Sequence, residues 1–326
     1  MDANIRQRRI GRRAALGGIT GSAGAAFLAA CGGRSNSGTP VVTTGAPVAT
    51  VPPGKQIAVA ATTTQIQDFV KNVGGSPVVV TGILKPNVDP HDYEPTVEDV
   101  NAIAKADIIF VHGVGLDSWM DKTIKTTNAK APAIMVTDGI KVLKGDENTP
   151  EGDPHCWFDP TLVQTMVANI AAGLAKVDPA NASAYRANAK AYSDQLTQLD
   201  GQLKGIFNQA PKEQRKLVTN HDAFRYLAQR YDLTIVGAVI PRLSDSAEPS
   251  AKEINDLIDT IKKEKVKAIF AESSANPKVA QQVAKETGIT IIDTLYGDSL
   301  GAPGSEADTY LKMMVYDATT ITNAIT

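Results

Sequence analysis

Apolar and β-branched residues gather in short runs along the body of the chain, separated by longer stretches with apolar residues at helical spacing. A first series of runs covers residues 57–61, 78–84, 107–111 and 133–136, and a second covers 217–219, 234–240, 267–271 and 290–293. Residues 96–106, 251–264 and 277–287 have the spacing of intervening helices. Because strands that alternate with helices form parallel sheets, we predict an α/β fold of two lobes. Each lobe is expected to have a mainly parallel sheet and a hydrophobic core of its own.

One long amphipathic stretch lies between the two series. Its apolar residues recur on one helical face, and they are Tyr185, Tyr192, Leu196, Leu199, Leu203 and Ile206. Pro179 marks the start of the stretch and Pro211 its end, so about thirty residues, or roughly 45 Å, are predicted to be helical. We expect a long rigid helix within residues 179–211 to join a lobe of residues 57–178 to a lobe of residues 212–326. The alternative, the seam of a coiled-coil dimer, is disfavoured by Gly201 and by the short repeat, so we expect a monomer.

The first thirty residues have the composition of an export signal. Several arginines precede a weakly apolar stretch that is too short and glycine-rich to span a membrane, so residues 1–30 are predicted to be a signal peptide. The signal ends in Leu-Ala-Ala-Cys, which resembles the lipobox of bacterial lipoproteins and makes Cys31 the expected site of lipidation. A plain secretory signal with an incidental cysteine is the alternative. The Arg12-Arg13 pair resembles a twin-arginine signal, and general secretory export stays open.

Residues 31–56 are rich in Gly, Ser, Thr, Pro and Val and nearly free of charge, as in a flexible tether. A tether that follows a lipidated cysteine would hold the folded body at the membrane while allowing it to move. We therefore expect a protein anchored by lipid at the extracytoplasmic face of the cell membrane.

Charge and cysteine content exclude some classes of function. The formal net charge is −2, so the chain lacks the basic excess that nucleic-acid binding requires. The two cysteines, Cys31 and Cys156, fall in different parts of the chain, so no disulfide framework is expected and stability must come from packing.

Three of the four histidines stand in similar sequence contexts. His91 lies in DPHDYEP, His155 in DPHCWFDP and His221 in TNHDAFRYL, and each is placed at the end of a predicted strand or just before a predicted helix. In open α/β sheets, ligands bind at this edge. Imidazole is a good ligand for late first-row divalent ions, and the prolines that precede His91 and His155 restrict both loops. The sequence therefore predicts a metal site made by these three histidines.

A fourth donor and several further charges accompany the histidines. Asp298, in YGDSLG after the last predicted strand, is a candidate carboxylate ligand that would complete a tetrahedral shell. Acidic residues that could offset the remaining positive charge from just outside the shell are Asp92, Glu94, Asp222 and Glu272. His112 lacks a proline frame and an acidic neighbour, and Cys156 lies in an apolar patch, so both are interpreted as structural residues.

The motifs DPHDYEP, DPHCWFDP, NHDAFRYL, SAEPSAKEI, IFAESSANPK and GDSLGAPGSEADTYLKMM, in this order, resemble the zinc/manganese solute-binding lipoproteins of bacterial ABC importers. The resemblance covers the chain from Ile57 onward. It implies two α/β lobes bridged by a rigid helix, with the metal in the cleft between them and no large hinge closure. It also implies the ligand set His91, His155, His221 and Asp298, with Glu272 near the site. A protein of this kind captures a metal ion and delivers it to the permease of the importer, and it is not an enzyme.

The choice between zinc and manganese depends on two observations that point in opposite directions. The manganese-selecting branch of the family commonly has a glutamate where His221 stands, and more nitrogen ligation favours Zn²⁺ over Mn²⁺. Zinc-dedicated members, however, often carry a histidine-rich loop, and residues 138–152 contain no histidine. We favour zinc.

Three other functions are compatible with some of these features. A zinc hydrolase would need an open coordination position, which four protein ligands would close, and no HExxH motif is present. A protein that binds a metal chelate such as a siderophore would need an aromatic-rich pocket, and aromatic residues make up only 5% of the chain. A surface adhesin whose lobes are held together by the metal is the third, and it does not exclude import.

Overall fold

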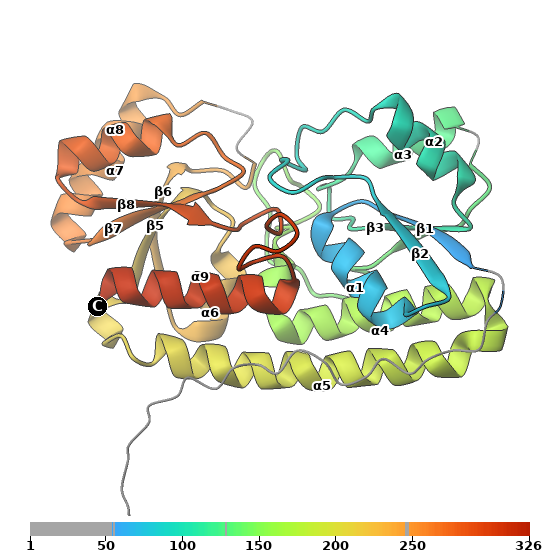
Figure 1. Cartoon of the computed structure of the whole chain (residues 1–326). Coiled ribbons are helices and arrows are strands. Elements are labelled where there is room, and N and C mark those ends of the chain that lie inside the picture. The colour runs from blue at the N-terminus through green and yellow to red at the C-terminus, as the bar shows by residue number, and fades with distance from the viewer. Residues whose placement is uncertain (1–53, 55, 128, 245–247) are drawn as a thin grey trace, which may run out of the picture. The chain divides into compact units, whose positions relative to one another are not determined.

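Two four-stranded parallel sheets organise the chain (Figure 1). The computed structural model describes residues 54, 56–127, 129–244 and 248–326. The strand orders are β2-β1-β3-β4 and β6-β5-β7-β8, so in each sheet the first strand of its series lies between the second and the third. We call the part built on the first sheet the N-terminal lobe and the part built on the second the C-terminal lobe. The predicted fold class, α/β with two lobes of parallel sheet, is confirmed.

The N-terminal lobe alternates strands and helices as the sequence predicts. Its elements are β1 (Ile57–Ala61), α1 (Thr64–Gly74), β2 (Val78–Gly82), α2 (Val97–Lys105), β3 (Ile108–Val111), α3 (Trp119–Thr127), β4 (Ala133–Met135), the 3₁₀ turn η1 (Cys156–Phe158) and α4 (Pro160–Val177). A capping box starts α2, in which the Thr96 hydroxyl accepts from the Asp99 amide and the Asp99 carboxylate accepts from the Thr96 amide. The loop of residues 83–96 between β2 and α2 therefore ends at a fixed point.

The C-terminal lobe repeats the plan. Its elements are η3 (Lys212–Gln214), β5 (Lys216–His221), α6 (Arg225–Tyr231), β6 (Thr234–Ile240), α7 (Ala251–Glu264), β7 (Ala268–Glu272), α8 (Lys278–Thr287), β8 (Thr290–Leu295) and α9 (Tyr310–Ile325). The predicted strand 217–219 is too short, because β5 pairs with β6 through His221, which lies opposite Ile240. His221 is thus the last residue of a strand and not a loop residue.

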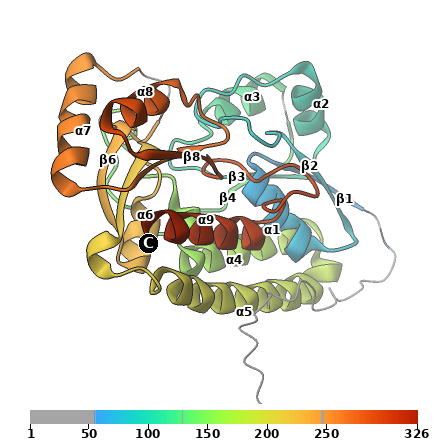
Figure 2. The same cartoon turned by 60° about the vertical axis from the view of Figure 1, so that its left-hand side comes forward.

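The stretch between the lobes is a 3₁₀ turn, η2 (Pro179–Asn181), followed by α5 (Ala182–Phe207). The apolar face of α5 is buried and packs on α1, α4 and α9, and in Figures 1 and 2 the helix runs along the base of both lobes. Within the described residues that face is therefore covered by the chain's own helices, which is not the arrangement of a dimer seam. No helix among the described residues is both long and apolar enough to cross a membrane.

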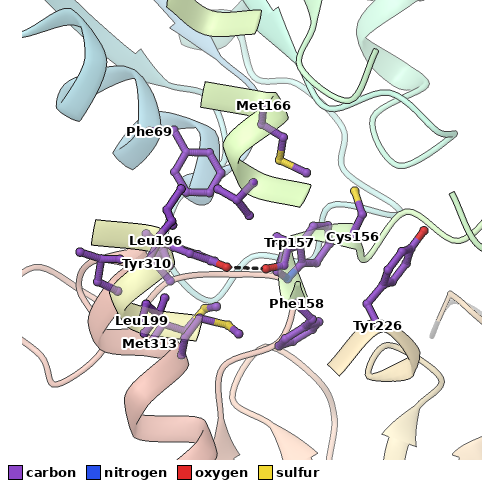
Figure 3. Packing of buried hydrophobic residues seen from close by; sticks show 14 of the residues in the cluster. Phe69, Cys156, Trp157, Phe158, Met166, Leu196, Leu199, Tyr226, Tyr310 and Met313 are labelled. Atoms are coloured by element: carbon purple, nitrogen blue, oxygen red, sulfur yellow. Dashed lines mark hydrogen bonds between the residues drawn. The ribbon is translucent and has the colours of Figure 1, made fainter. Parts of the chain in front are cut away.

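The largest hydrophobic core belongs to both lobes, so the expectation that each lobe depends on a core of its own is wrong in part. Figure 3 shows Phe69 of α1 and Met166 of α4 packed with residues of α5 and α9 around Trp157. The Tyr310 hydroxyl at the start of α9 donates to the carbonyl of Trp157 at 2.6 Å. Smaller separate clusters lie on the outer side of each sheet. The periodicity of α5 revealed a buried face but not that α4 and α9 would cover it.

Arg12, Arg13, Cys31 and the tether up to residue 53 lie outside the described residues.

Candidate metal centre

Four side chains from four separate segments meet between the two lobes. His91 comes from the loop after β2, His155 precedes η1, His221 ends β5 and Asp298 follows β8. One ligand atom of each side chain lies within 4.8 Å of the others. Two donors thus come from each lobe, and all four come from the region at the carboxyl ends of the strands, as the sequence predicts.

The spacing of the donor atoms matches a tetrahedral metal site. Asp298 Oδ1 lies 3.3 Å from His155 Nε2, and Asp298 Oδ2 lies 3.6 Å from His91 Nε2 and 3.5 Å from His221 Nε2. The Nε2 atoms of His155 and His221 are 3.3 Å apart. In a tetrahedral zinc site with bonds of about 2.0–2.1 Å, neighbouring donors are separated by about 3.3–3.5 Å. A dication therefore fits between these atoms without rearrangement of most of the donors.

The donors are removed from water. The side chains of His155 and His221 are fully buried, that of Asp298 is 3% exposed and that of His91 is 6% exposed. Among the described residues, His91 Nε2 and Asp298 Oδ1 have no hydrogen-bond partner. Buried polar atoms without partners are costly unless something binds them. A metal ion would satisfy both.

Two buried carboxylates fix the orientation of two imidazole rings. His155 Nδ1 donates to Asp153 Oδ1 at 2.8 Å, and His221 Nδ1 lies 3.0 Å from Glu272 Oε1. Because a carboxylate only accepts, His155 carries a proton on Nδ1, and Nε2 is the nitrogen that faces the site and can bind a metal once it has lost its own proton. The position of Glu272 agrees with what the resemblance implies, at the last residue of β7. Asp153 was missed by the sequence reasoning, although it stands two residues before a candidate ligand.

The two Asp-Pro-His sequences form the same local turn. The Asp89 carboxylate accepts from the backbone N–H of His91 at 2.8 Å, and Asp153 accepts from the backbone N–H of His155 at 3.0 Å. Asp side chains commonly bond backbone groups two residues on, and the intervening proline has no N–H to compete. Of these two aspartates, Asp153 is also hydrogen-bonded to the histidine ring. The repeated Asp-Pro-His motif does not show which of its two aspartates has this second role.

Burial and charge act against each other on the site residues. Burial by itself would lower the pKa of His155, but the hydrogen bonds to Asp153 and Asp298 outweigh it and raise the pKa to about 9. Burial by itself would raise the pKa of Asp298, but His221, His155 and His91 hold the pKa of this carboxyl well below its usual range. Asp298 is therefore an anion in the folded chain.

The other predicted acidic neighbours lie farther out. Asp222 Oδ2 lies 3.8 Å from Arg225 Nε. Burial raises the pKa of Asp222 to about 6 despite the opposing charge of Arg225. Asp92 and Glu94 are exposed on the loop that carries His91. Among the described residues, the metal-ligating group does not include any of the three.

His112 and Cys156 lie beside the site and outside the ligand group. His112 Nε2 lies 2.7 Å from the carbonyl oxygen of Pro154 and 3.8 Å from Cys156 Sγ, and its ring makes an edge contact with Trp157. Burial raises the pKa of the Cys156 thiol, which keeps it neutral. Both residues support the loop that presents His155.

The chain is similar to several known proteins over the residues that form its two lobes. The sequence model of the family described as "Zinc-uptake complex component A periplasmic" matches residues 59–324. The iron-binding protein YfeA of Yersinia pestis is 34% identical over 269 residues, which cover 82% of this chain and 86% of YfeA. The manganese ABC transporter substrate-binding lipoprotein PsaA of Streptococcus mitis is 32% identical over 274 residues, 81% of this chain and 87% of PsaA. Among solved structures, the periplasmic zinc-binding protein TroA of Treponema pallidum has a TM-score of 0.78 and 30% identity, and the match covers 83% of this chain and 99% of TroA.

Proposed function

Because this chain belongs to the family of periplasmic zinc-uptake complex component A proteins, we propose that His91, His155, His221 and Asp298 bind one divalent metal ion, which the protein delivers to an ABC importer. Its relatives include substrate-binding proteins of metal ABC transporters, and the chain is not an enzyme. The permease of such a transporter is the partner that receives the metal.

The observation that carries this proposal is the spacing of the donors. Asp298 lies 3.3–3.6 Å from three imidazole nitrogens, and two of those nitrogens, on His155 and His221, are 3.3 Å apart. The chain holds this arrangement with buried carboxylates behind two of the rings. A shell of four protein donors leaves no open position for a catalytic water, which supports capture over hydrolysis.

We propose that zinc is the preferred cargo. Three nitrogens and one carboxylate in a tetrahedral arrangement suit Zn²⁺, whereas Mn²⁺ prefers more oxygen donors and a larger coordination number. The relatives do not decide the question, since the names of YfeA, PsaA and TroA refer to iron, manganese and zinc respectively. His221 supplies the third nitrogen, so its identity is the main support for zinc.

We also propose that the protein acts at the extracytoplasmic face of the membrane as a lipid-anchored monomer. The Leu-Ala-Ala-Cys sequence that ends at Cys31 supports the anchor, and PsaA is named as a lipoprotein. The burial of the apolar face of α5 within the chain supports the monomer. A chelate-binding protein is disfavoured, because donors that are at most 6% exposed leave no surface for an organic ligand.

The test is the metal content of protein that lacks residues 1–31, equilibrated with buffered zinc and manganese in competition and measured by mass spectrometry. We expect one zinc ion per chain in the parent protein and a loss of affinity by orders of magnitude in H155A. Glu94→Gln, which changes an exposed acidic residue on the loop of His91, is the matched control and should keep stoichiometric metal. Parent protein without stoichiometric metal would refute the assignment, and a preference for manganese would refute the choice of zinc.

A further inference from the structure

The loop that carries His91 and the loop that carries Asp298 are joined directly across the two lobes. The backbone N–H of Asn87, four residues before His91, donates to Ser299 Oγ at 2.9 Å, and Ser299 immediately follows Asp298. The Ser299 hydroxyl donates in turn to the carbonyl of Leu300 at 2.9 Å. Ser299 is 2% exposed, whereas Asn87 is exposed. We call this contact the Asn87–Ser299 link.

The backbone of Asn87 is held in a conformation that most residues avoid. Its φ is 62°, in the left-handed region, where asparagine is tolerated better than most non-glycine residues. Asp232 and Lys265, two of the other described non-glycine residues with positive φ, end helices α6 and α7. Asn87 ends no helix but is the third residue of a turn that the Val88 N–H closes on the carbonyl of Lys85 at 3.2 Å, and from this turn its own N–H donates to Ser299. The Asn87 side chain also accepts from Ser273 Oγ at 3.1 Å, at the surface.

The loop of Asp298 is anchored to the N-terminal lobe by other bonds. Leu300 N donates to Thr64 Oγ1 at 2.8 Å, and the carbonyl of Gly297 accepts from Trp157 Nε1 at 3.2 Å and from Gln65 Nε2 at 3.4 Å. In Figure 1 the loop between β8 and α9 accordingly reaches α1. Loss of the Asn87–Ser299 link would therefore leave Asp298 in place.

The loop of His91 has fewer ties. Trp119 Nε1 donates to the carbonyl of Pro90 at 3.1 Å, but this bond lies within the N-terminal lobe. The rings of His155 and His221 have carboxylates behind them, whereas His91 is bonded to its neighbouring carboxylate, Asp89, through its backbone N–H. Of the four donor side chains, that of His91 is also the most exposed.

We propose that Asn87 and Ser299 are positioning residues that hold His91 against Asp298 and thereby set the rate at which the bound metal is released. This inference rests on the proposed function, because it requires that the four donors bind a metal. The link acts on one ligand only: when it is broken, His91 leaves the metal more often while His155, His221 and Asp298 remain fixed.

The test compares Ser299→Ala with Ser273→Ala in protein that lacks residues 1–31 and is loaded with one equivalent of Zn²⁺. Ser299→Ala removes the acceptor of the link, and Ser273→Ala removes only the surface bond to the Asn87 side chain. Release of Zn²⁺ to an excess of a colorimetric chelator is followed by stopped flow. We expect release from Ser299→Ala to be about fivefold faster, the factor that corresponds to one typical hydrogen bond, and release from Ser273→Ala to stay within about twofold of the parent protein.

Amide hydrogen exchange of the zinc-loaded proteins separates positioning from a general loosening. We expect faster exchange in Ser299→Ala over residues 85–92 and unchanged exchange over residues 297–300. Equal release rates in Ser299→Ala and the parent protein, or faster exchange in both segments, would overturn the inference. If Ser299→Ala fails to fold, the Asn87 amide of the parent protein decides, since protection supports the link and exchange at the free-peptide rate overturns it. Failure of the parent protein to hold zinc would refute the proposed function instead, before any release rate is compared.

Discussion

Removal of the Asp153 carboxylate should weaken metal binding although Asp153 is not a ligand. Asp153 is fully buried, and its Oδ1 accepts both from the backbone N–H of His155 and from Nδ1 of the same ring. Its Oδ2 lies 3.5 Å from Arg225 Nη1. The carboxylate thus holds the ring in the orientation in which Nε2 faces Asp298, and its charge makes that nitrogen a better donor.

The size of the effect depends on what replaces the carboxylate. Loss of a partner that orients a metal-bound histidine typically costs about 10–100-fold in affinity, or about 1.4–2.7 kcal/mol. In Asp153→Ala both the charge and the bond to Nδ1 are lost, so we expect a loss near the upper end of this range. In Asp153→Asn the amide oxygen can still accept from Nδ1, so only the charge is lost and we expect about tenfold.

Asp89→Ala is the matched control, because Asp89 makes the same turn before His91 and its carboxylate bonds the backbone N–H of that histidine. Zinc affinity is measured by competition with a fluorescent chelator of known affinity, and the fold is checked by circular dichroism. We expect the affinities to fall in the order Asp89→Ala, Asp153→Asn, Asp153→Ala, with the last lowest. An affinity for Asp153→Ala within about threefold of the parent protein would refute the role of Asp153. An equal loss in Asp89→Ala would show that the turn, and not the bond to the ring, is what matters.

Two further predictions concern the anchor and the pH dependence of stability. In cells, Cys31→Ala should move the protein from the membrane fraction to the soluble fraction, and retention at the membrane would contradict lipid anchoring. Burial raises the pKa of Asp68 from 3.8 to about 6, against its bonds from the Tyr310 amide and the Tyr192 hydroxyl. The folded chain therefore holds this proton more tightly than the unfolded chain, so the stabilisation is complete below about pH 4 and is lost as the pH rises through 6, by about 3 kcal/mol. Denaturant unfolding of the metal-free protein should show that the parent loses stability relative to Asp68→Asn over this window, and parallel curves would contradict the shift.

The sequence predicts the fold class and most strands because each strand is a short apolar run bounded by helical spacing. The predicted helix 251–264 coincides with α7, whose start is fixed by a capping box of Ser250 and Glu253. The ends of β5 and β7 are less predictable, since His221 and Glu272 are polar residues at the ends of buried strands. Their inclusion in the strands depends on pairing with neighbouring strands, which local composition does not encode.

The sequence groups the four candidate donors because His91, His221 and Asp298 follow or end strands and His155 directly precedes a short helix. The contacts that orient these side chains are harder to predict from the sequence. Asp153 and Asp89 stand in the same motif, yet Asp153 bonds a histidine ring whereas Asp89 bonds a backbone N–H. The Asn87–Ser299 link joins residues 212 positions apart, and although Ser299 lies in the motif that carries Asp298, that motif does not show that its partner precedes His91. Such contacts follow from how the two lobes are packed, and the sequence does not show that packing.

The packing of the lobes also explains why candidate donors from both lobes lie close together. Trp157 lies two residues after His155, and its indole N–H donates to the carbonyl of Gly297, which immediately precedes Asp298. The carbonyl of Trp157 accepts from the Tyr310 hydroxyl, and the ring of Trp157 is part of the core that both lobes share. The 3.3 Å distance between His155 Nε2 and Asp298 Oδ1 is therefore set by a buried residue of the common core. Because that core would have to open for the lobes to separate widely, we expect a bound metal to exchange through the loop of His91.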